Sequence, residues 1–168
     1  MVIQDHGHPD QVNHNIWASN IYAEDSAYAV VTELNDFGHS NVTVVNVTAT
    51  RVQDPVYMFY LSNVTFSDLN IVNATTTTSV VSIHNVNNFS MQKVRVKGGV
   101  PTSTVVSVKE SSNVSLDDIY PKKTTHFNYG AVLLSSSETN ASTITVTNSN
   151  FQYILKKPPV FVKIEASG

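Results

Sequence analysis

Asn41-Val-Thr-Val-Val-Asn-Val-Thr-Ala49 is a nine-residue pattern that recurs along almost the whole chain. In register, copies begin at Asn15, Asn41, Asn63, Asn88 and Asn113, and a looser sixth copy begins at Thr143. Successive copies begin 26, 22, 25, 25 and 30 residues apart. A short period of this kind, built from strands, is typical of a solenoid, in which each coil buries its apolar side by stacking on its neighbours.

The second and fourth positions of the nine-residue pattern are apolar in every copy. They are Ile16/Ala18, Val42/Val44, Val64/Phe66, Phe89/Met91, Val114/Leu116 and Ile144/Val146. This alternation predicts a strand with one buried face. The sixth position is polar and apolar residues resume at the seventh and ninth, so we expect a bend that joins two short strands.

A third apolar run follows the pattern in each coil, at residues 29–31, 56–58, 80–83, 105–108, 131–134 and 160–164. The connectors between the runs contain Pro and Gly, which break regular structure. Three short strands per coil, stacked in parallel, predict an all-β fold: a right-handed parallel β-helix of about six coils. We expect residues 15–168 to form this domain and residues 1–14 to form a leader or cap.

Stacked coils also predict ladders of polar side chains. The first position of the pattern places Asn15, Asn41, Asn63, Asn88 and Asn113 above one another, where they can bond amide to amide. The sixth position includes Asp68, Lys93 and Asp118, whose alternating charges attract between neighbouring coils. We interpret both ladders as structural.

Composition limits the function classes. The 168 residues are 41% hydrophobic and 14% charged, with no cysteine, which excludes disulfides and thiolate metal sites. No apolar run reaches the length of a membrane span.

Residues 1–90 hold eight acids and one base, whereas residues 91–168 hold five acids and nine bases. Head-to-tail self-association is one use of this asymmetry, and a solvated surface is the alternative. Basic residues without interleaved aromatics argue against nucleic acid.

The coil pattern, from Asn15 to about Glu165, resembles the pectin-lyase-like superfamily of right-handed β-helices. That superfamily includes polysaccharide lyases, polygalacturonases, phage tailspikes and surface adhesins, so the resemblance implies a fold more than an activity. Polygalacturonases carry Asn-Thr-Asp, Asp-Asp, Gly-His-Gly and Arg-Ile-Lys motifs, of which this chain matches only Asp117-Asp118. Adjacent strand residues point to opposite faces, whereas inverting hydrolysis needs two convergent carboxyls.

Two other arrangements have residue types suited to chemistry. A superfamily lyase would need carboxylates and a basic residue, and Arg51 with Asp25 and Asp54 is the set the sequence offers. His6 and His8 are one residue apart and could bind zinc or copper on an extended strand, although a flexible leader is the simpler interpretation. We expect no cofactor.

Outward aromatic and basic residues favour a glycan as partner. Trp17, Tyr22 and Tyr57 are expected to face out from the coils, where exposed rings can stack on sugars. The alternative for Trp17 is that it covers the open first coil. Arg95 and Lys97 alternate with buried positions and can form a patch for an anionic glycan.

Seven Asn-x-Ser/Thr sequons suggest an extracellular or cell-surface protein. Four of them coincide with the asparagine ladder, which leaves Asn46, Asn73 and Asn140 as the better glycan acceptors. No secretory signal peptide is visible after Met1, and a segment excised from a longer solenoid is one explanation.

Our leading hypothesis is a non-catalytic extracellular β-helix module, acting as a stalk, an adhesin segment or a carbohydrate-binding surface. The competing hypothesis is a polysaccharide lyase or glycoside hydrolase, or a degenerate relative of one. Carboxylates that converge with Arg51 in one groove would favour the enzyme. A surface of Asn, Thr and Ser ladders would favour the module.

Overall fold

The computed structural model describes residues 1–3, 13–32, 38–76, 78–99, 102–121, 127–136, 143–149 and 162–166. Its strands are β1 (Val2–Ile3), β2 (His14–Glu24), β3 (Tyr28–Thr32), β4 (His39–Thr50), β5 (Asp54–Val72), β6 (Ser79–Lys97), β7 (Thr102–Lys109), β8 (Ser112–Pro121), β9 (Phe127–Ser136), β10 (Ile144–Thr147) and β11 (Val162–Ala166). These residues contain no helix that could cross a membrane.

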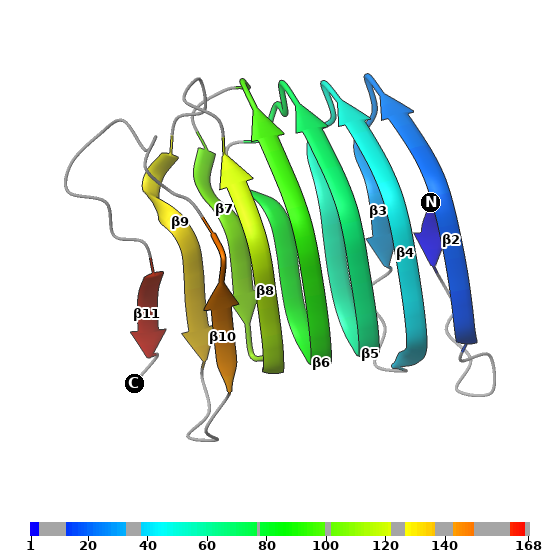
Figure 1. The fold of residues 1–168 in the computed structure, drawn as a ribbon, viewed down its shortest axis with the longest axis vertical. Coiled ribbons are helices and arrows are strands. Elements are labelled where there is room, and N and C mark those ends of the chain that lie inside the picture. The colour runs from blue at the N-terminus through cyan, green and yellow to red at the C-terminus, as the bar shows by residue number, and fades with distance from the viewer. Residues whose placement is uncertain are drawn as a thin grey trace.

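The strands form two facing layers (Figure 1). We call the layer of β2, β4, β8, β10 and the later halves of β5 and β6 the near sheet. The far sheet comprises β1, β3, β7, β9, β11 and the earlier halves of β5 and β6. The chain ascends the near sheet, crosses the top, descends the far sheet and advances from blue to red, which makes the solenoid right-handed (Figure 1).

Every strand pairing is parallel, and the register follows the nine-residue pattern. In the near sheet Ile16, Val42, Val64, Phe89, Val114 and Ile144 pair in succession. The all-β parallel solenoid is therefore confirmed. The described residues form about four turns, where the sequence predicted about six coils.

The bends between short strands are made by residues with positive φ. Asparagines of the first position have φ of 52–56°, and the sixth position continues the series from Asn20 to Asn148. Asn and Asp tolerate this left-handed conformation better than other side chains that carry a Cβ. The polar sixth position is thus a corner of the coil, as the break in alternation predicted.

Further corners occur outside the nine-residue pattern, at positions where the residue type varies from coil to coil. Asp25, Arg51, Asn73 and Gly98 form one such column, ten residues after the first position in each coil. Tyr60, Asn85 and Glu110 form another on the far side. A Cβ added at Gly98 would lie 2.1 Å from Asn73 Oδ1, so glycine is the residue that this stacked corner accepts.

The space between the sheets is filled by the apolar positions of the pattern. Phe66, Phe89, Met91, Leu116 and Ile119 are among the largest fully buried side chains. The two phenylalanines lie on adjacent coils, because Phe89 pairs with Val64 and Phe66 pairs with Met91. This continuous core holds the outward side chains of both sheets on a rigid support.

Candidate functional site

The asparagine column forms a continuous hydrogen-bonded ladder. Nδ2 of Asn41 donates to Oδ1 of Asn15, and the same bond links Asn63 to Asn41, Asn88 to Asn63 and Asn113 to Asn88, at 3.0–3.1 Å. Each amide donates to one coil and accepts from the next. These side chains are committed to holding the coils together.

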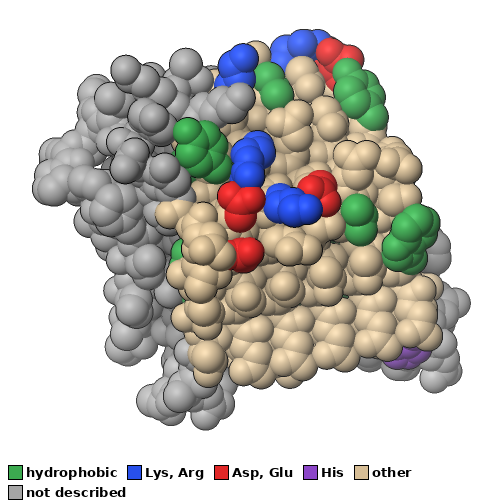
Figure 2. Space-filling view, viewed as in Figure 1, with side chains coloured by type: hydrophobic (Ala, Val, Ile, Leu, Met, Phe, Trp, Pro, Cys, Tyr) green, Lys and Arg blue, Asp and Glu red, His purple; other side chains and the backbone are tan. Residues whose placement is uncertain are grey.

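The sixth position makes a second, mixed ladder on the near sheet. Asn46 donates to Oδ1 of Asn20 at 2.6 Å, and Lys93 Nζ lies 3.5 Å from Asp68 Oδ1. Asp118, however, accepts from Arg95 at 2.5 Å. Acidic and basic side chains therefore lie side by side across the middle of this face (Figure 2).

Arg51 lies at the corner between the first two coils and binds both neighbouring acids. Its Nε and Nη2 donate to the two oxygens of Asp25 at 2.7 Å, and Nη2 also donates to Glu24 at 2.6 Å. The Tyr22 hydroxyl donates to the other Glu24 oxygen at 2.7 Å. These bonds raise the Arg51 pKa further above its ordinary value. Arg51 therefore stays protonated and is poorly suited to act as the base of a lyase.

The remaining carboxylates suggested for catalysis are also engaged. Asp54 accepts a hydrogen bond from the Thr76 hydroxyl at 2.9 Å. Asp117 accepts from the Thr147 hydroxyl and from Asn148, and these bonds hold its pKa below the ordinary range. A general acid for glycoside hydrolysis needs a raised pKa, so Asp117 has the wrong shift for that role.

The residues predicted to bind sugar do not share one surface. Trp17 and Tyr22 belong to β2 of the near sheet and are 70% and 65% exposed. Arg95 also lies on the near sheet, where it is held by Asp118 and lies 5.8 Å above the Tyr120 ring, and Lys97 follows it. Tyr57 belongs to the far sheet.

Tyr57 is instead part of an aromatic cluster on the outer surface of the far sheet. We define this cluster as Tyr28, Tyr57, Phe59, Tyr60 and His84. The Tyr57 and Phe59 rings meet edge to face at 4.4 Å, and Phe59 meets the His84 ring at 5.3 Å. Tyr28 and Tyr60 extend the row at 6.1 Å from Tyr57 and 6.4 Å from Phe59.

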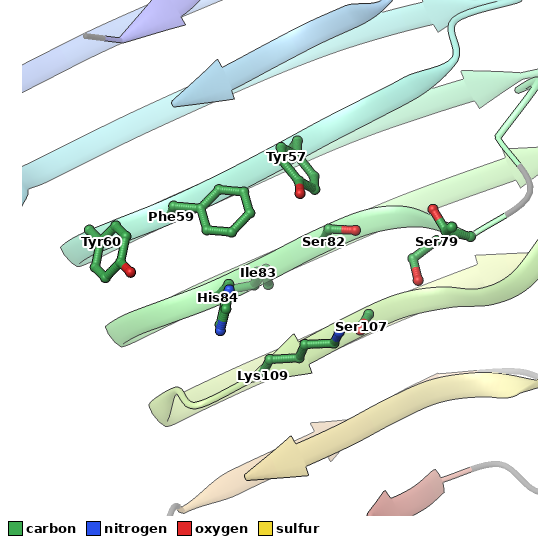
Figure 3. A pocket seen from close by; sticks show the side chains of 10 residues that line it. Tyr57, Phe59, Tyr60, Ser79, Ser82, Ile83, His84, Ser107 and Lys109 are labelled. Atoms are coloured by element: carbon green, nitrogen blue, oxygen red, sulfur yellow. The ribbon is translucent and has the colours of Figure 1, made fainter. Parts of the chain in front are cut away.

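The aromatic cluster borders an open concavity of about 460 Å³. Its polar side chains come from the next two coils, since Ser82 and Ser107 continue the row of Tyr57 whereas His84 and Lys109 continue the row of Phe59 (Figure 3). Nε2 of His84 lies 2.9 Å from Glu110 Oε2. Burial raises the pKa of the Tyr57 phenol, so this hydroxyl is protonated at neutral pH and can donate a hydrogen bond.

Of the aromatic cluster, only Tyr57 was predicted from the sequence as a binding residue, whereas Tyr28, Phe59, Tyr60 and His84 were not. Phe59 is only 6% exposed although it lies on the outer face, because neighbouring rings cover it. The signal that could have revealed the cluster is the stacking of the third strand, which aligns Tyr57 with Ser82 and Phe59 with His84. Tyr60 has φ of 51°, which breaks strand alternation at that residue.

Two of the sequence predictions fall on residues outside those described: the histidine pair His6 and His8, and the sequon at Asn140. Within the described residues, no three His, Cys, Asp or Glu side chains are grouped so that they could hold a metal ion.

Comparison of the chain with protein-family models, with curated proteins and with solved structures gives no match.

Proposed function

We propose that this chain is a non-catalytic β-solenoid module that binds a glycan through the aromatic cluster of its far sheet. The observation that carries the proposal is the row of rings beside serine hydroxyls in one open concavity. Sugars present C–H faces that pack on aromatic rings and hydroxyls that need hydrogen-bond partners. Tyr57, Ser82 and Ser107 offer both kinds of contact in adjacent coils.

The support beneath the aromatic cluster favours binding. Met58 and Ile83 point inward from the same strands and are buried in the core, so the outward rings stand on a packed sheet. Tyr57 and Phe59 further restrict one another through their edge-to-face contact. A ligand that docks on such a preformed surface loses little free energy to ordering of the protein.

We propose a non-catalytic role because the carboxylates and the arginine considered for catalysis take part in structural bonds. Arg51 is held by Glu24 and Asp25, and Asp118 is held by Arg95. Beside the aromatic cluster, Glu110 lies against His84. We propose an extracellular or cell-surface location, where polysaccharides and glycoproteins are the ligands at hand.

The experiment is a glycan array on which both binding and the release of new sugar ends are measured. The affinity for each glycan that binds is then measured by calorimetry. Tyr57→Ala should weaken binding by about threefold to tenfold, the scale of one aromatic contact. Trp17→Ala is the matched control, because it removes an exposed ring from the near sheet and should leave affinity unchanged.

Three outcomes would contradict the proposal. Release of sugar ends would show an enzyme. Loss of binding on Trp17→Ala, with Tyr57→Ala unaffected, would move the site to the near sheet. If no glycan on the array binds, the aromatic cluster is not a glycan-binding site.

A further inference from the structure

The concavity beside the aromatic cluster has two chemically different ends. Its lining comes from three neighbouring coils, with the rings of Tyr57 and Phe59 on β5 and Lys109 on β7 (Figure 3). Serines separate the two ends, because Ser82 pairs with Tyr57 and Ser107 pairs with Ser82. Paired strands lie about 4.8 Å apart, so the Tyr57 and Ser107 positions are separated by roughly 10 Å. A ligand that contacts both ends is therefore larger than a single sugar ring.

Lys109 supplies a positive charge at one end of the concavity. Its side chain is exposed and runs back along β7 toward Ser107 (Figure 3). No described carboxylate lies within ion-pair distance of the Lys109 ammonium, and Glu110, the next residue, lies against His84. Ser107 faces outward but is only 6% exposed, so it forms part of the floor. An anionic group above this floor can accept a charge-assisted hydrogen bond from Lys109.

The aromatic end is unfavourable for a second anion. Burial is the largest cause of the raised Tyr57 pKa, and the negative charge of Asp54 also contributes to it. A carboxylate beside the Tyr57 ring would meet the same negative charge and the negative face of the ring. The C–H face of a neutral sugar meets neither obstacle. The concavity therefore suits a ligand that is anionic at one end only.

We infer that the glycan bound here ends in one acidic sugar, whose carboxylate binds Lys109 while a neutral sugar packs on Tyr57. This inference rests on the proposed glycan-binding function and adds Lys109 to it as the residue that determines specificity. A polyanionic chain with a carboxylate on every sugar fits less well, because it would place a second negative charge at the aromatic end.

The test is calorimetry of the full chain with acidic glycans and their uncharged counterparts. The probes are sialyllactose and glucuronyllactose, the methyl ester of each, lactose and polygalacturonate. At least one of the two acids should bind about threefold to tenfold more tightly than its own ester, the scale of a hydrogen-bonded charge on an exposed side chain. Lys109→Met keeps the length of the side chain and should abolish this preference, whereas Lys109→Arg should retain it.

Lys97→Met is the matched control, because it removes the same charge from the near sheet and should leave the preference unchanged. Circular dichroism checks that each variant retains the fold. Equal affinities for acid and ester, an unchanged preference in Lys109→Met, or tighter binding of polygalacturonate would overturn this inference and leave the proposed function standing. If none of the probes and no glycan on the array binds, the inference and the proposed function are both wrong.

Discussion

At the scale of single residues, asparagine has two structural roles in this protein. It adopts the left-handed conformation that turns the chain at each corner, and its amide bonds to the equivalent corner of the next coil. Glycine would satisfy the first requirement without the second. Glutamine could offer the amide bond but tolerates positive φ poorly. The recurrence of Asn at the first position follows from the two requirements together.

Substitution of Asn63 separates these two roles. Asn63→Gly removes the bonds to Asn41 and Asn88 but accepts φ of 54°, so we expect a loss of about 1 kcal/mol in free energy of unfolding. Asn63→Ala loses the same bonds and adds about 1–2 kcal/mol of backbone strain. Urea unfolding of both variants measures the difference. Equal losses would mean that the corner conformation contributes no strain.

The sequence predicted the corner at the sixth position, because a polar residue there interrupts the apolar alternation, and it predicted the asparagines of the first position as a ladder but not as corners. It did not predict the corners at Arg51, Tyr60 and Glu110, since these side chains carry no preference for positive φ. There the conformation is imposed by the stacking of coils rather than by the residue. The aromatic cluster was missed for a related reason, because Tyr60 lies at such a corner and Phe59 immediately precedes it.

At the scale of strands, adjoining coils are joined by backbone pairing and by side chains at the corners. The end of β2 is linked to the connector after β4 by Arg51, which bonds to Glu24 and Asp25. The bonds from Arg51 lower the Asp25 pKa, and those from Tyr22 and then Arg51 lower the Glu24 pKa. The junction of the first two coils is consequently sensitive to acid.

The free energy of unfolding should fall as the pH is lowered, and the size of this fall should depend on Arg51. Both carboxyls have folded-state pKa values below their ordinary 3.8 and 4.5, so their stabilisation is complete above that range. It is lost as the pH falls through the lowered values, because the unfolded chain then binds more protons. Arg51→Gln should flatten this acid dependence in urea unfolding across pH.

Lys97→Gln is the control for charge alone, because it removes a cation from the near sheet and leaves the Arg51 bonds intact. It should retain the acid dependence of the unmodified chain. An Arg51→Gln protein with an unchanged acid dependence would show that the junction does not contribute to it.

At the scale of the whole molecule, the strongest prediction from sequence was the register. The repeat of apolar residues and asparagines predicted which residues of neighbouring coils lie side by side. The observed pairing of β4, β5, β6 and β8 has this register. The period does not specify how outward side chains from distant coils combine into a surface. Tyr57 and Trp17 are both outward residues, yet they lie on opposite sheets.

If the chain is produced in a cell that glycosylates sequons, asparagines engaged in the ladders should carry less glycan than asparagines outside them. Asn46 shares the ladder engagement of Asn41, whereas Asn73 is exposed and its Oδ1 faces Gly98 of the next coil. Asn140 and Asn46 remain predicted acceptors, and among the described sequons we expect Asn73 to be the most occupied. Mass spectrometry of the folded monomer measures occupancy at each site.

Asn73→Gln should remove that glycan without unfolding the protein. High occupancy of Asn63 or Asn88 in the folded monomer would contradict the prediction, since a sugar on Nδ2 competes with the amide bond to the next coil.

The stacking of coils also has a mechanical consequence. The hydrogen bonds between coils run along the rod, so tension applied along the axis acts on one coil boundary at a time. With successive patterns 25 residues apart in the middle of the chain, each detached coil would release roughly 80–90 Å of extended backbone. Pulled from its ends, the rod would lengthen in regular steps, as an extensible tether whose remaining coils keep their shape.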